Sequence, residues 1–271
     1  MRTDRQPESG REARVPRERR DPRERRAGRL LTLFAACVAP IGLCAPALAA
    51  DCSRVVSAGH PLTVCRADVR HESIQLFLKD ENGRPLHTIA ALEKSLAVQG
   101  KRLTFAMNAG MFEPDYSPVG LYIEQGKQLS PLNLKNGRGN FFLKPNGVFY
   151  VTGAGAGVVQ STEFPKVAAP VTLATQSGPM LVIQGQLHYR LSKTSTSRHI
   201  RNGVGVDDAG KVIFAVSDAP LTLYELAVAF RNDLHCPNAL YLDGSVTSVY
   251  APSLHQNIQR ADLGPILAII E

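Results

Sequence analysis

A chain of 271 residues with 44% hydrophobic residues can bury a full core, which excludes an intrinsically disordered protein. The formal net charge of +7 is unevenly placed, because residues 1–30 hold eleven Arg against six Asp or Glu. The remaining residues are therefore close to neutral. Nucleic-acid binding, the usual interpretation of an arginine-rich arm, would require this arm to be retained.

The next segment, LLTLFAACVAPIGLCAPALAA (30–50), has no charged residue and ends in the small-residue pattern Ala47-Leu48-Ala49. This pattern is typical of a secretory signal peptide with an A-x-A cleavage site. We therefore expect an arginine-rich n-region and signal peptide at residues 1–50, followed by a single domain at 51–271. The domain would be exported to the periplasm or the extracellular space and would have no nucleic-acid partner.

Pro40, Gly42 and Pro46 interrupt this apolar run, whereas a membrane span needs about 20 firmly apolar residues. We expect no stable membrane span after cleavage. An uncleaved anchor and a lipid on Cys37 are the alternatives.

Cleavage near Ala49 would remove two of the five cysteines and leave Cys52, Cys65 and Cys236 in an oxidising compartment. Cys52 and Cys65 flank the short segment SRVVSAGHPLTV, whose Gly and Pro fit a hairpin. We predict a disulfide between them and a buried free thiol at Cys236. The three cysteines have no zinc-ligand spacing.

Two segments have helical periodicity. HTIAALEKSLAVQG (87–100) places Ile89, Leu92 and Leu96 on one face and stops at Gly100, and TLYELAVAFRNDLH (222–235) opens with a capping box, Thr and Glu three residues apart.

The rest of the domain alternates between strand and turn patterns typical of hairpins. The predicted hairpins turn at Glu81–Gly83, Gln125–Gly126, Pro145–Gly147, Gln184–Gly185 and Asp208–Gly210. The predicted fold class is α+β, a twisted, mostly antiparallel or mixed β-sheet built from successive hairpins with two main flanking helices.

Several strands end in hydrogen-bonding side chains and a glycine, and strand ends are where a rigid scaffold presents catalytic groups. These residues are Asn108, Gly110, Glu113, Gln176, Ser177, Arg201, Asn202, Asp243, Gly244 and Ser245. Each also has a purely structural interpretation. Asn108-Ala109-Gly110 fits a turn, Arg201-Asn202 a solvated strand start, and Asp243-Gly244 a type I′ hairpin turn.

Six blocks in this order resemble the phosphodiester glycosidase family: NAGMFE (108–113), SPVGLYIE (117–124), GNFFLKPNGVF (139–149), ATQSGPM (174–180), RNGVG (201–205) and NALYLDGS (238–245). The resemblance covers about residues 62–252. It implies an α/β fold with a twisted sheet and flanking helices, and a glycosidase that cleaves a sugar from a phosphodiester or related anomeric linkage. Asp243-Gly244-Ser245-Val246 departs from the glycine-rich sequence of the best-known branch and resembles the bacterial branch, so the sugar specificity does not carry over.

Hydrolysis at an anomeric carbon needs one carboxylate as nucleophile or base, and a second as acid when the leaving group is poor. Phosphate leaves as a stable anion, so the reaction depends less on a second carboxyl group as acid. Asp243 and Glu113 are the candidate carboxylates, and Asp243 is preferred because it ends an apolar strand. Arg201 is the candidate phosphate clamp, since its fork of donors matches phosphate oxygens.

We expect the substrate, a glycan or glycosyl phosphate of the cell envelope or extracellular space, to be held by the polar residues around these three. The expected binding residues are Asn108, Gly110, Gln176, Ser177, Asn202, Gly244 and Ser245. Ser177 is a weaker candidate nucleophile, because no Gly-x-Ser-x-Gly pattern surrounds it.

A divalent cation, Ca²⁺ or Mg²⁺, has possible ligands in Asp115, Asp207, Asp208 and Asp243, but no EF-hand spacing organises them. The metal site is therefore left unassigned. The alternative function is a non-catalytic carbohydrate or cell-wall binding protein on the same fold. The absence of Trp weighs against it, since sugar-binding sites commonly stack aromatic rings on the sugar.

The signal-peptide interpretation predicts a mature protein that begins near Ala50 or Asp51 outside the cytoplasm. Mass spectrometry of the exported fraction checks this start. Soluble cytoplasmic protein that still carries residues 1–30 would contradict it.

Overall fold

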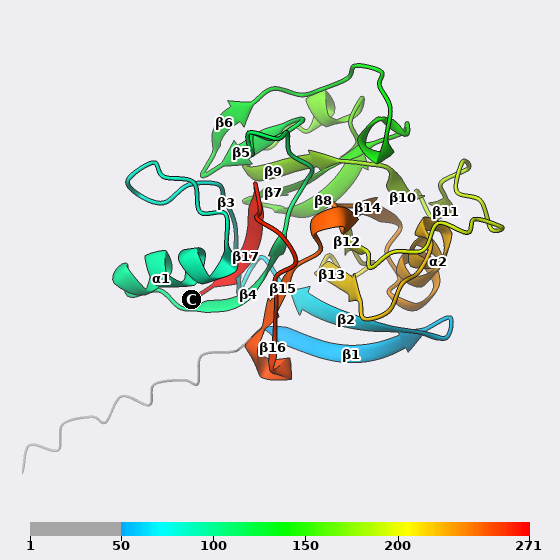
Figure 1. The fold of residues 1–271 in the computed structure, drawn as a ribbon. Coiled ribbons are helices and arrows are strands. Elements are labelled where there is room, and N and C mark those ends of the chain that lie inside the picture. Colours follow the sequence, from blue (N-terminus) through cyan, green and yellow to red (C-terminus); the bar gives the residue numbers. More distant parts are fainter. Residues whose placement is uncertain (1–49) are drawn as a thin grey trace, which may run out of the picture. The chain divides into compact units, whose positions relative to one another are not determined.

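The computed structural model describes residues 50–271, where three antiparallel sheets surround a shared core (Figure 1). The arginine-rich segment and signal peptide predicted for residues 1–50 lie outside the described residues, apart from Ala50.

The first sheet has seven strands, in the order β1 (Asp51–Ser57), β2 (His60–Ala67), β13 (Val212–Ser217), β12 (Asn202–Val206), β14 (Asn238–Tyr241), β10 (Met180–Ile183) and β11 (Gln186–Leu187). The second has five, in the order β16 (Gln256–Ile258), β15 (Val249–Ala251), β4 (Leu103–Asn108), β17 (Ile266–Ile270) and β3 (Ser73–Phe77). The third also has five, in the order β6 (Lys127–Ser130), β5 (Tyr122–Glu124), β9 (Val171–Ser177), β7 (Gly147–Thr152) and β8 (Gly155–Gln160).

The predicted α+β class is confirmed, with the strands divided among three sheets. Every strand pair within residues 50–271 is antiparallel. The family resemblance implied an α/β fold with a twisted sheet and flanking helices, and this antiparallel pairing corrects that class to α+β. Short turns join many of the strands, and such turns can connect only antiparallel neighbours.

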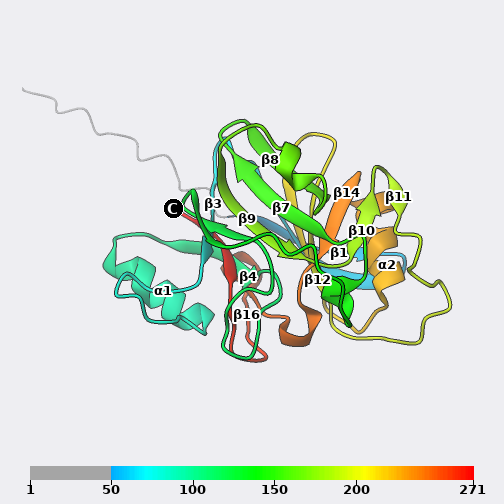
Figure 2. The same ribbon diagram turned by 90° about the horizontal axis from the view of Figure 1, so that it is seen from above.

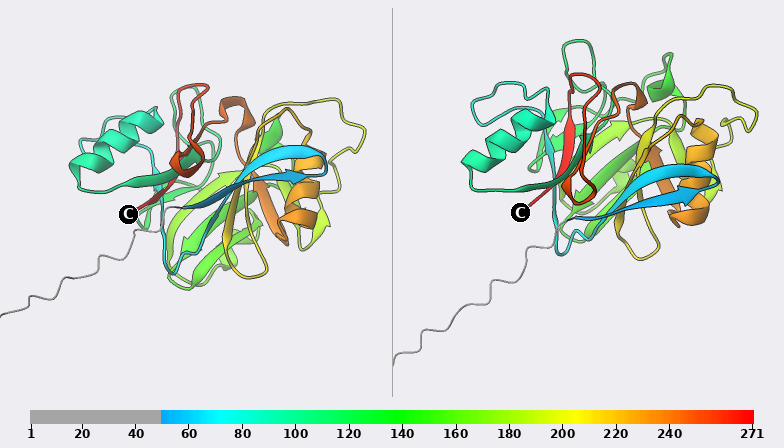
Figure 3. Two further views of the ribbon diagram at one scale, coloured as in Figure 1. Left: turned by 90° about the horizontal axis from the view of Figure 1, so that it is seen from below. Right: turned by 60° about the horizontal axis from the view of Figure 1, so that its bottom comes forward.

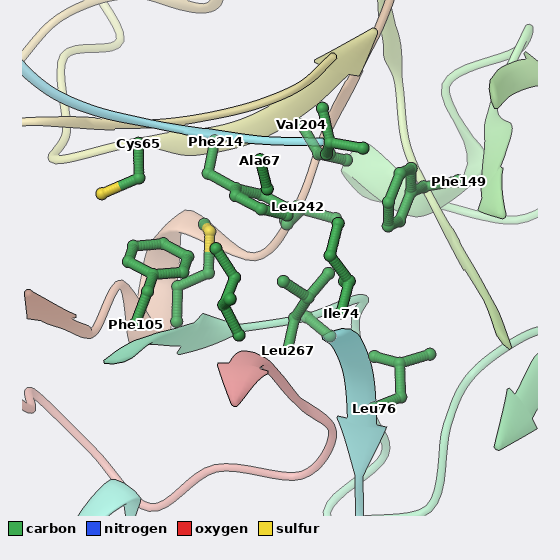
Figure 4. Close-up of a cluster of buried hydrophobic side chains, with 14 of the residues drawn as sticks. Cys65, Ala67, Ile74, Leu76, Phe105, Phe149, Val204, Phe214, Leu242 and Leu267 are labelled. Carbon is green, nitrogen blue, oxygen red and sulfur yellow. The ribbon is translucent and has the colours of Figure 1, made fainter. Parts of the chain in front are cut away.

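The central core lies where the inner faces of the three sheets meet. Phe214 of the first sheet stacks on Phe105 of the second at 5.2 Å between ring centroids and packs edge-on against Phe149 of the third at 6.2 Å. Figure 4 shows these three side chains with others of the same cluster, including Ile74 and Leu267 of the second sheet and Leu242, which follows β14. Burial of this shared apolar surface holds the sheets together.

Two helices cover outer sheet faces, as predicted. Helix α1 (Ile89–Val98) buries Ile89, Leu92 and Leu96 against the second sheet, and the Thr88 hydroxyl accepts a hydrogen bond from Ala91 N at its start. Helix α2 (Leu223–Val228) continues into a π-helical turn at Ala229–Asp233 and packs on the first sheet. Figures 2 and 3 show α1 beside β4 and β17, and α2 beside β10 and β11. The Thr222–Glu225 capping box is present.

Three of the five predicted hairpins are confirmed: β5–β6, β10–β11 and β12–β13. The other two predicted hairpins are wrong in part. The segment after the Glu81–Gly83 turn does not form a strand and makes only an isolated antiparallel bridge, from Lys79 to Pro85. The run before Pro145 forms a short 3₁₀ turn, Asn140–Phe142, so β7 pairs with β8 and β9 instead.

Strands β1 and β2 form a hairpin in which Cys52 lies directly opposite Cys65, and a disulfide joins them. Cys236 is free and buried, so the predicted pairing is confirmed. Among residues 50–271, none of the helices has the length and apolarity that a transmembrane span requires.

Thiol counting checks this cysteine pattern. Burial raises the pKa of the Cys236 thiol, so it should react only after denaturation. Unreduced, denatured protein that begins at Ala50 should show one thiol, and a Cys236→Ala variant should show none. Opening the disulfide should lower the free energy of unfolding by on the order of 3 kcal/mol. Three thiols in unreduced protein would contradict the pairing.

Candidate active site

Asp243 lies where the chain crosses from the first sheet to the second. The chain leaves β14, makes a 3₁₀ turn at Gly244–Val246 and enters β15, drawn in orange in Figure 1. Asp243 has φ −98° and ψ 102°, and Gly244 is not among the residues with positive φ. A type I′ turn needs positive φ at both central residues. The hairpin-turn interpretation of Asp243-Gly244 is therefore wrong.

The two oxygens of the Asp243 carboxylate have different environments. Oδ1 accepts hydrogen bonds from Ser245 N at 3.0 Å and from Ser245 Oγ at 2.5 Å. Oδ2 makes no hydrogen bond within residues 50–271. The side chain is thus held in place through one oxygen while the other stays available to a ligand.

Asp243 lines a pocket of about 600 Å³. Its other lining residues come from the β4–β5 connection, the 140–143 turn, the 190–201 loop, the start of α2, the end of β14 and the 3₁₀ turn after it. They are Met111, Phe112, Val119, Asn140, Leu143, Arg190, Leu191, Ser192, Ser195, Ser197, His199, Arg201, Leu223, Tyr224, Tyr241, Gly244 and Ser245. Asp243 contributes the one carboxylate of this lining, and Arg190 and Arg201 contribute two guanidinium groups.

Arg201 is buried in the pocket wall, with 3% of its surface exposed. Nε donates to the Leu221 carbonyl at 2.9 Å, Nη2 to the Ser197 carbonyl at 3.0 Å, and Nη1 to the Tyr241 hydroxyl at 3.3 Å. These acceptors are all neutral, and none of the ion pairs within residues 50–271 includes Arg201. The solvated strand start proposed for Arg201 and Asn202 is therefore wrong, because both side chains are buried.

A buried cation without a counter-ion carries an electrostatic cost that a bound anion would offset. Arg201 therefore gives the pocket a preference for anionic ligands. This is the electrostatic character that a phosphate site needs.

Tyr241 connects Arg201 to the turn. Its hydroxyl oxygen accepts from Arg201 Nη1 and from Gly244 N, the latter at 2.9 Å, and the guanidinium carbon lies 5.5 Å from its ring centroid. A Cβ at position 244 would collide with this hydroxyl, so only glycine allows the backbone to approach so closely. Burial raises the pKa of Tyr241, which keeps the hydroxyl protonated.

Asn108 and Asn202 form a buried amide pair beneath the turn. Asn108 Nδ2 donates to the Asp243 carbonyl oxygen at 2.8 Å, while Asn108 Oδ1 accepts from Asn202 Nδ2 and from Ser248 N. Neither residue lines the pocket. Of the predicted binding residues, Asn108 thus holds the backbone at Asp243 and at Ser248, and Asn202 holds Asn108.

Gln176, Ser177 and Gly110 lie together in a second buried region that also stays outside the pocket lining. Gln176 Oε1 accepts from Leu121 N and Asn133 N, and Nε2 donates to the Asn133 carbonyl and the Ser161 hydroxyl. The amide therefore ties three loops together.

The backbone of Gly110 approaches the same strand. Gly110 N donates to Thr175 Oγ1, and a Cβ at position 110 would collide with the Gln176 carbonyl oxygen. Ser177 Oγ is buried and has no hydrogen-bond partner within the described residues.

Glu113 is exposed in the turn that follows Met111 and Phe112, and it does not line the pocket. The same turn contains Asp115, whose Oδ1 accepts from the N–H and hydroxyl of Ser117. These hydrogen bonds lower the pKa of Asp115. The Asp115–Ser117 contact repeats, outside the pocket, the contact between Asp243 and Ser245.

Asp207 accepts from Ala209 N and Lys211 N in the β12–β13 turn, as a polar hairpin turn requires. No group of three His, Cys, Asp or Glu side chains within residues 50–271 is arranged to hold a metal ion. The four aspartates considered as cation ligands therefore do not form a common site.

Four pocket residues were not predicted from the sequence: Tyr241, His199, Arg190 and Tyr224. Tyr241 stands in an apolar strand, where a buried aromatic residue is expected. For Arg190 and His199 the signal is the long polar segment HYRLSKTSTSRH (188–199), which separates two strands and is too long for an ordinary turn. Tyr224 stands in the predicted helix, where no signal marks it.

Known proteins resemble this chain in sequence and in fold. The sequence model of the phosphodiester glycosidase family matches residues 101–262. The uncharacterized protein YigE of Escherichia coli K12 is 38% identical over 179 residues, which cover 66% of this chain and 70% of YigE.

Among solved structures, the catalytic domain of zebrafish N-acetylglucosamine-1-phosphodiester alpha-N-acetylglucosaminidase, auto-inhibited by its pro-peptide, has a TM-score of 0.54 at 17% identity. The match covers 80% of this chain and 81% of that domain. A hypothetical protein from Synechocystis has a TM-score of 0.47 at 17% identity, over 81% of this chain and 61% of that protein. From the extent of the family match and the identity to YigE, the chain belongs to the phosphodiester glycosidase family.

Proposed function

We propose that the protein is an exported hydrolase that cleaves the bond between the anomeric carbon of a sugar and a phosphodiester oxygen. Its substrate is a glycan or glycosyl phosphate of the cell envelope or the extracellular space. Family membership supports hydrolysis at such a linkage. The observation that carries the proposal is a single pocket lined by Asp243, whose Oδ2 accepts no hydrogen bond within residues 50–271, and by the buried Arg201, which forms no ion pair within those residues.

Asp243 acts at the sugar. Its carboxylate takes a proton from the attacking water, whose oxygen then bonds to the anomeric carbon. Ser245 fixes Oδ1 and leaves Oδ2 to meet the water, and Asn108 fixes the Asp243 carbonyl. Holding a base in one orientation lowers the entropic part of the barrier.

Arg201 acts on the leaving group. As the bond between the anomeric carbon and the phosphate oxygen breaks, its electron pair stays on that oxygen and the phosphate gains negative charge. The guanidinium stabilises this charge from the pocket wall. A phosphate monoester leaves as a stable anion, so hydrolysis does not depend on Glu113 as an acid.

Substituting Asp243 tests this assignment. Asp243→Asn keeps the oxygen that accepts from Ser245 but cannot take a proton. It should lower kcat about a hundredfold or more, a barrier increase of about 2.7 kcal/mol, and change the melting temperature little. The assay measures hydrolysis of methyl phosphodiesters of hexose and N-acetylhexosamine 1-phosphates.

Asp115→Asn is the matched control, because Asp115 makes the same contacts with a serine two residues on, outside the pocket. Asp115→Asn should leave kcat within about twofold of the wild-type value. This change is far smaller than the roughly hundredfold loss, about 2.7 kcal/mol, expected for Asp243→Asn. Normal turnover by Asp243→Asn would show that Asp243 has no catalytic part. A wild-type protein that binds these esters without hydrolysing them would instead support the carbohydrate-binding alternative.

A further inference from the structure

The Tyr241 hydroxyl has one hydrogen-bonding function that the protein leaves unused. A phenol oxygen accepts through its lone pairs and donates through its single O–H. Arg201 Nη1 and Gly244 N already donate to this oxygen. The O–H itself has no acceptor among residues 50–271. The hydroxyl therefore still needs an acceptor, and not a donor.

The two accepted hydrogen bonds also make this hydroxyl a better donor. A cation and a backbone N–H both withdraw electron density from the oxygen, which polarises the O–H bond. They also fix the oxygen, and so limit the directions in which its proton can point. An unsatisfied O–H in a largely buried side chain costs free energy until an acceptor reaches it.

That acceptor belongs to the pocket ligand, because Tyr241 lines the pocket beside Arg201, Asp243 and Gly244. Arg201, which forms no ion pair within residues 50–271, brings a positive charge next to the hydroxyl, and this charge favours an anionic oxygen there. We infer that Tyr241 donates a hydrogen bond to a phosphate oxygen of the substrate, an assignment that rests on the proposed function. Tyr241 is then a catalytic residue that binds the leaving group opposite Asp243.

This contact strengthens during the reaction. When the bond to the anomeric carbon breaks, its electron pair moves to the phosphate, whose charge changes from −1 to −2. The Tyr241 proton stays on its own oxygen, and the proton of the attacking water goes to Asp243. A donor aimed at an oxygen that gains charge stabilises the transition state more than the bound substrate, so it acts on kcat.

Tyr241→Phe tests the inference on two substrates with the same sugar, a methyl phosphodiester and a p-nitrophenyl glycoside that has no phosphate. We expect kcat/KM for the phosphodiester to fall about ten- to hundredfold, the range for a hydrogen bond to a charged group. For the nitrophenyl glycoside it should fall less than about threefold, since no phosphate is present to lose the contact. Tyr250→Phe is the control, because the Tyr250 hydroxyl donates to Glu93 and lies outside the pocket.

The two-substrate ratio separates a phosphate contact from a structural role. If Tyr241 only supported Gly244, its loss would displace Asp243 and slow both substrates equally, which would overturn the inference. Unchanged turnover of both would overturn it as well. If Tyr241→Phe fails to fold, 3-fluorotyrosine at position 241 is the second variant. It keeps both accepted hydrogen bonds and has a more acidic O–H. The inference then requires that the ratio of kcat/KM for the phosphodiester to kcat/KM for the nitrophenyl glycoside changes.

Titrating the wild-type protein and Tyr241→Phe with inorganic phosphate tests the Tyr241 contact separately from the proposed function. If the wild-type protein hydrolyses neither substrate, the proposed function fails, and phosphate affinity then decides the role of Tyr241. A loss of about tenfold or more in Tyr241→Phe would support the contact. Equal affinity, or no phosphate binding by the wild-type protein, would overturn it.

Discussion

The hydrogen bond from the Asn108 amide to the Asp243 carbonyl oxygen joins two sheets at the point where the chain passes from one to the other. A crossing chain leaves the hydrogen-bond ladder of its first sheet, so its buried polar groups need other partners. Asn108, at the end of β4, supplies one of them, and Asn202 of the neighbouring sheet holds Asn108 in turn. The position of the Asp243 carboxylate follows from this arrangement.

The second constraint is electrostatic. Arg201 is buried against carbonyl and hydroxyl oxygens and lacks a carboxylate partner within residues 50–271. Arg201 Nη1 and the backbone N–H of Gly244, next to the proposed base, both donate to the Tyr241 hydroxyl oxygen. The Tyr241 hydroxyl thus joins the cation to the residue that follows Asp243, and this residue is a glycine because any side chain there would collide with the hydroxyl.

The sequence predicted the features that depend on neighbouring residues. The capping box of α2 and the cross-strand disulfide each involve residues close together in the chain. The polar strand ends at Asp243 and Arg201 were also found from sequence, and the pocket includes both. These signals are local, so no knowledge of the tertiary structure was needed.

The direction of each side chain could not be predicted in the same way. Leu240 and Leu242 point into the central core, whereas Tyr241, between them, points to the α2 side and the pocket. Alternation along a strand predicts opposite faces but not which face carries a site. The structural role of Gln176 could not be predicted either, because its hydrogen-bond partners lie 15 to 55 residues away along the chain.

A structure of the protein soaked with a sugar 1-phosphate would show directly which residues face the phosphate and the anomeric carbon. We predict a phosphate within hydrogen-bonding distance of Arg201 and the Tyr241 hydroxyl, with the anomeric carbon facing Asp243 Oδ2. A sugar phosphate bound in this pocket with its phosphate away from Arg201, or with Asp243 away from the anomeric carbon, would contradict it.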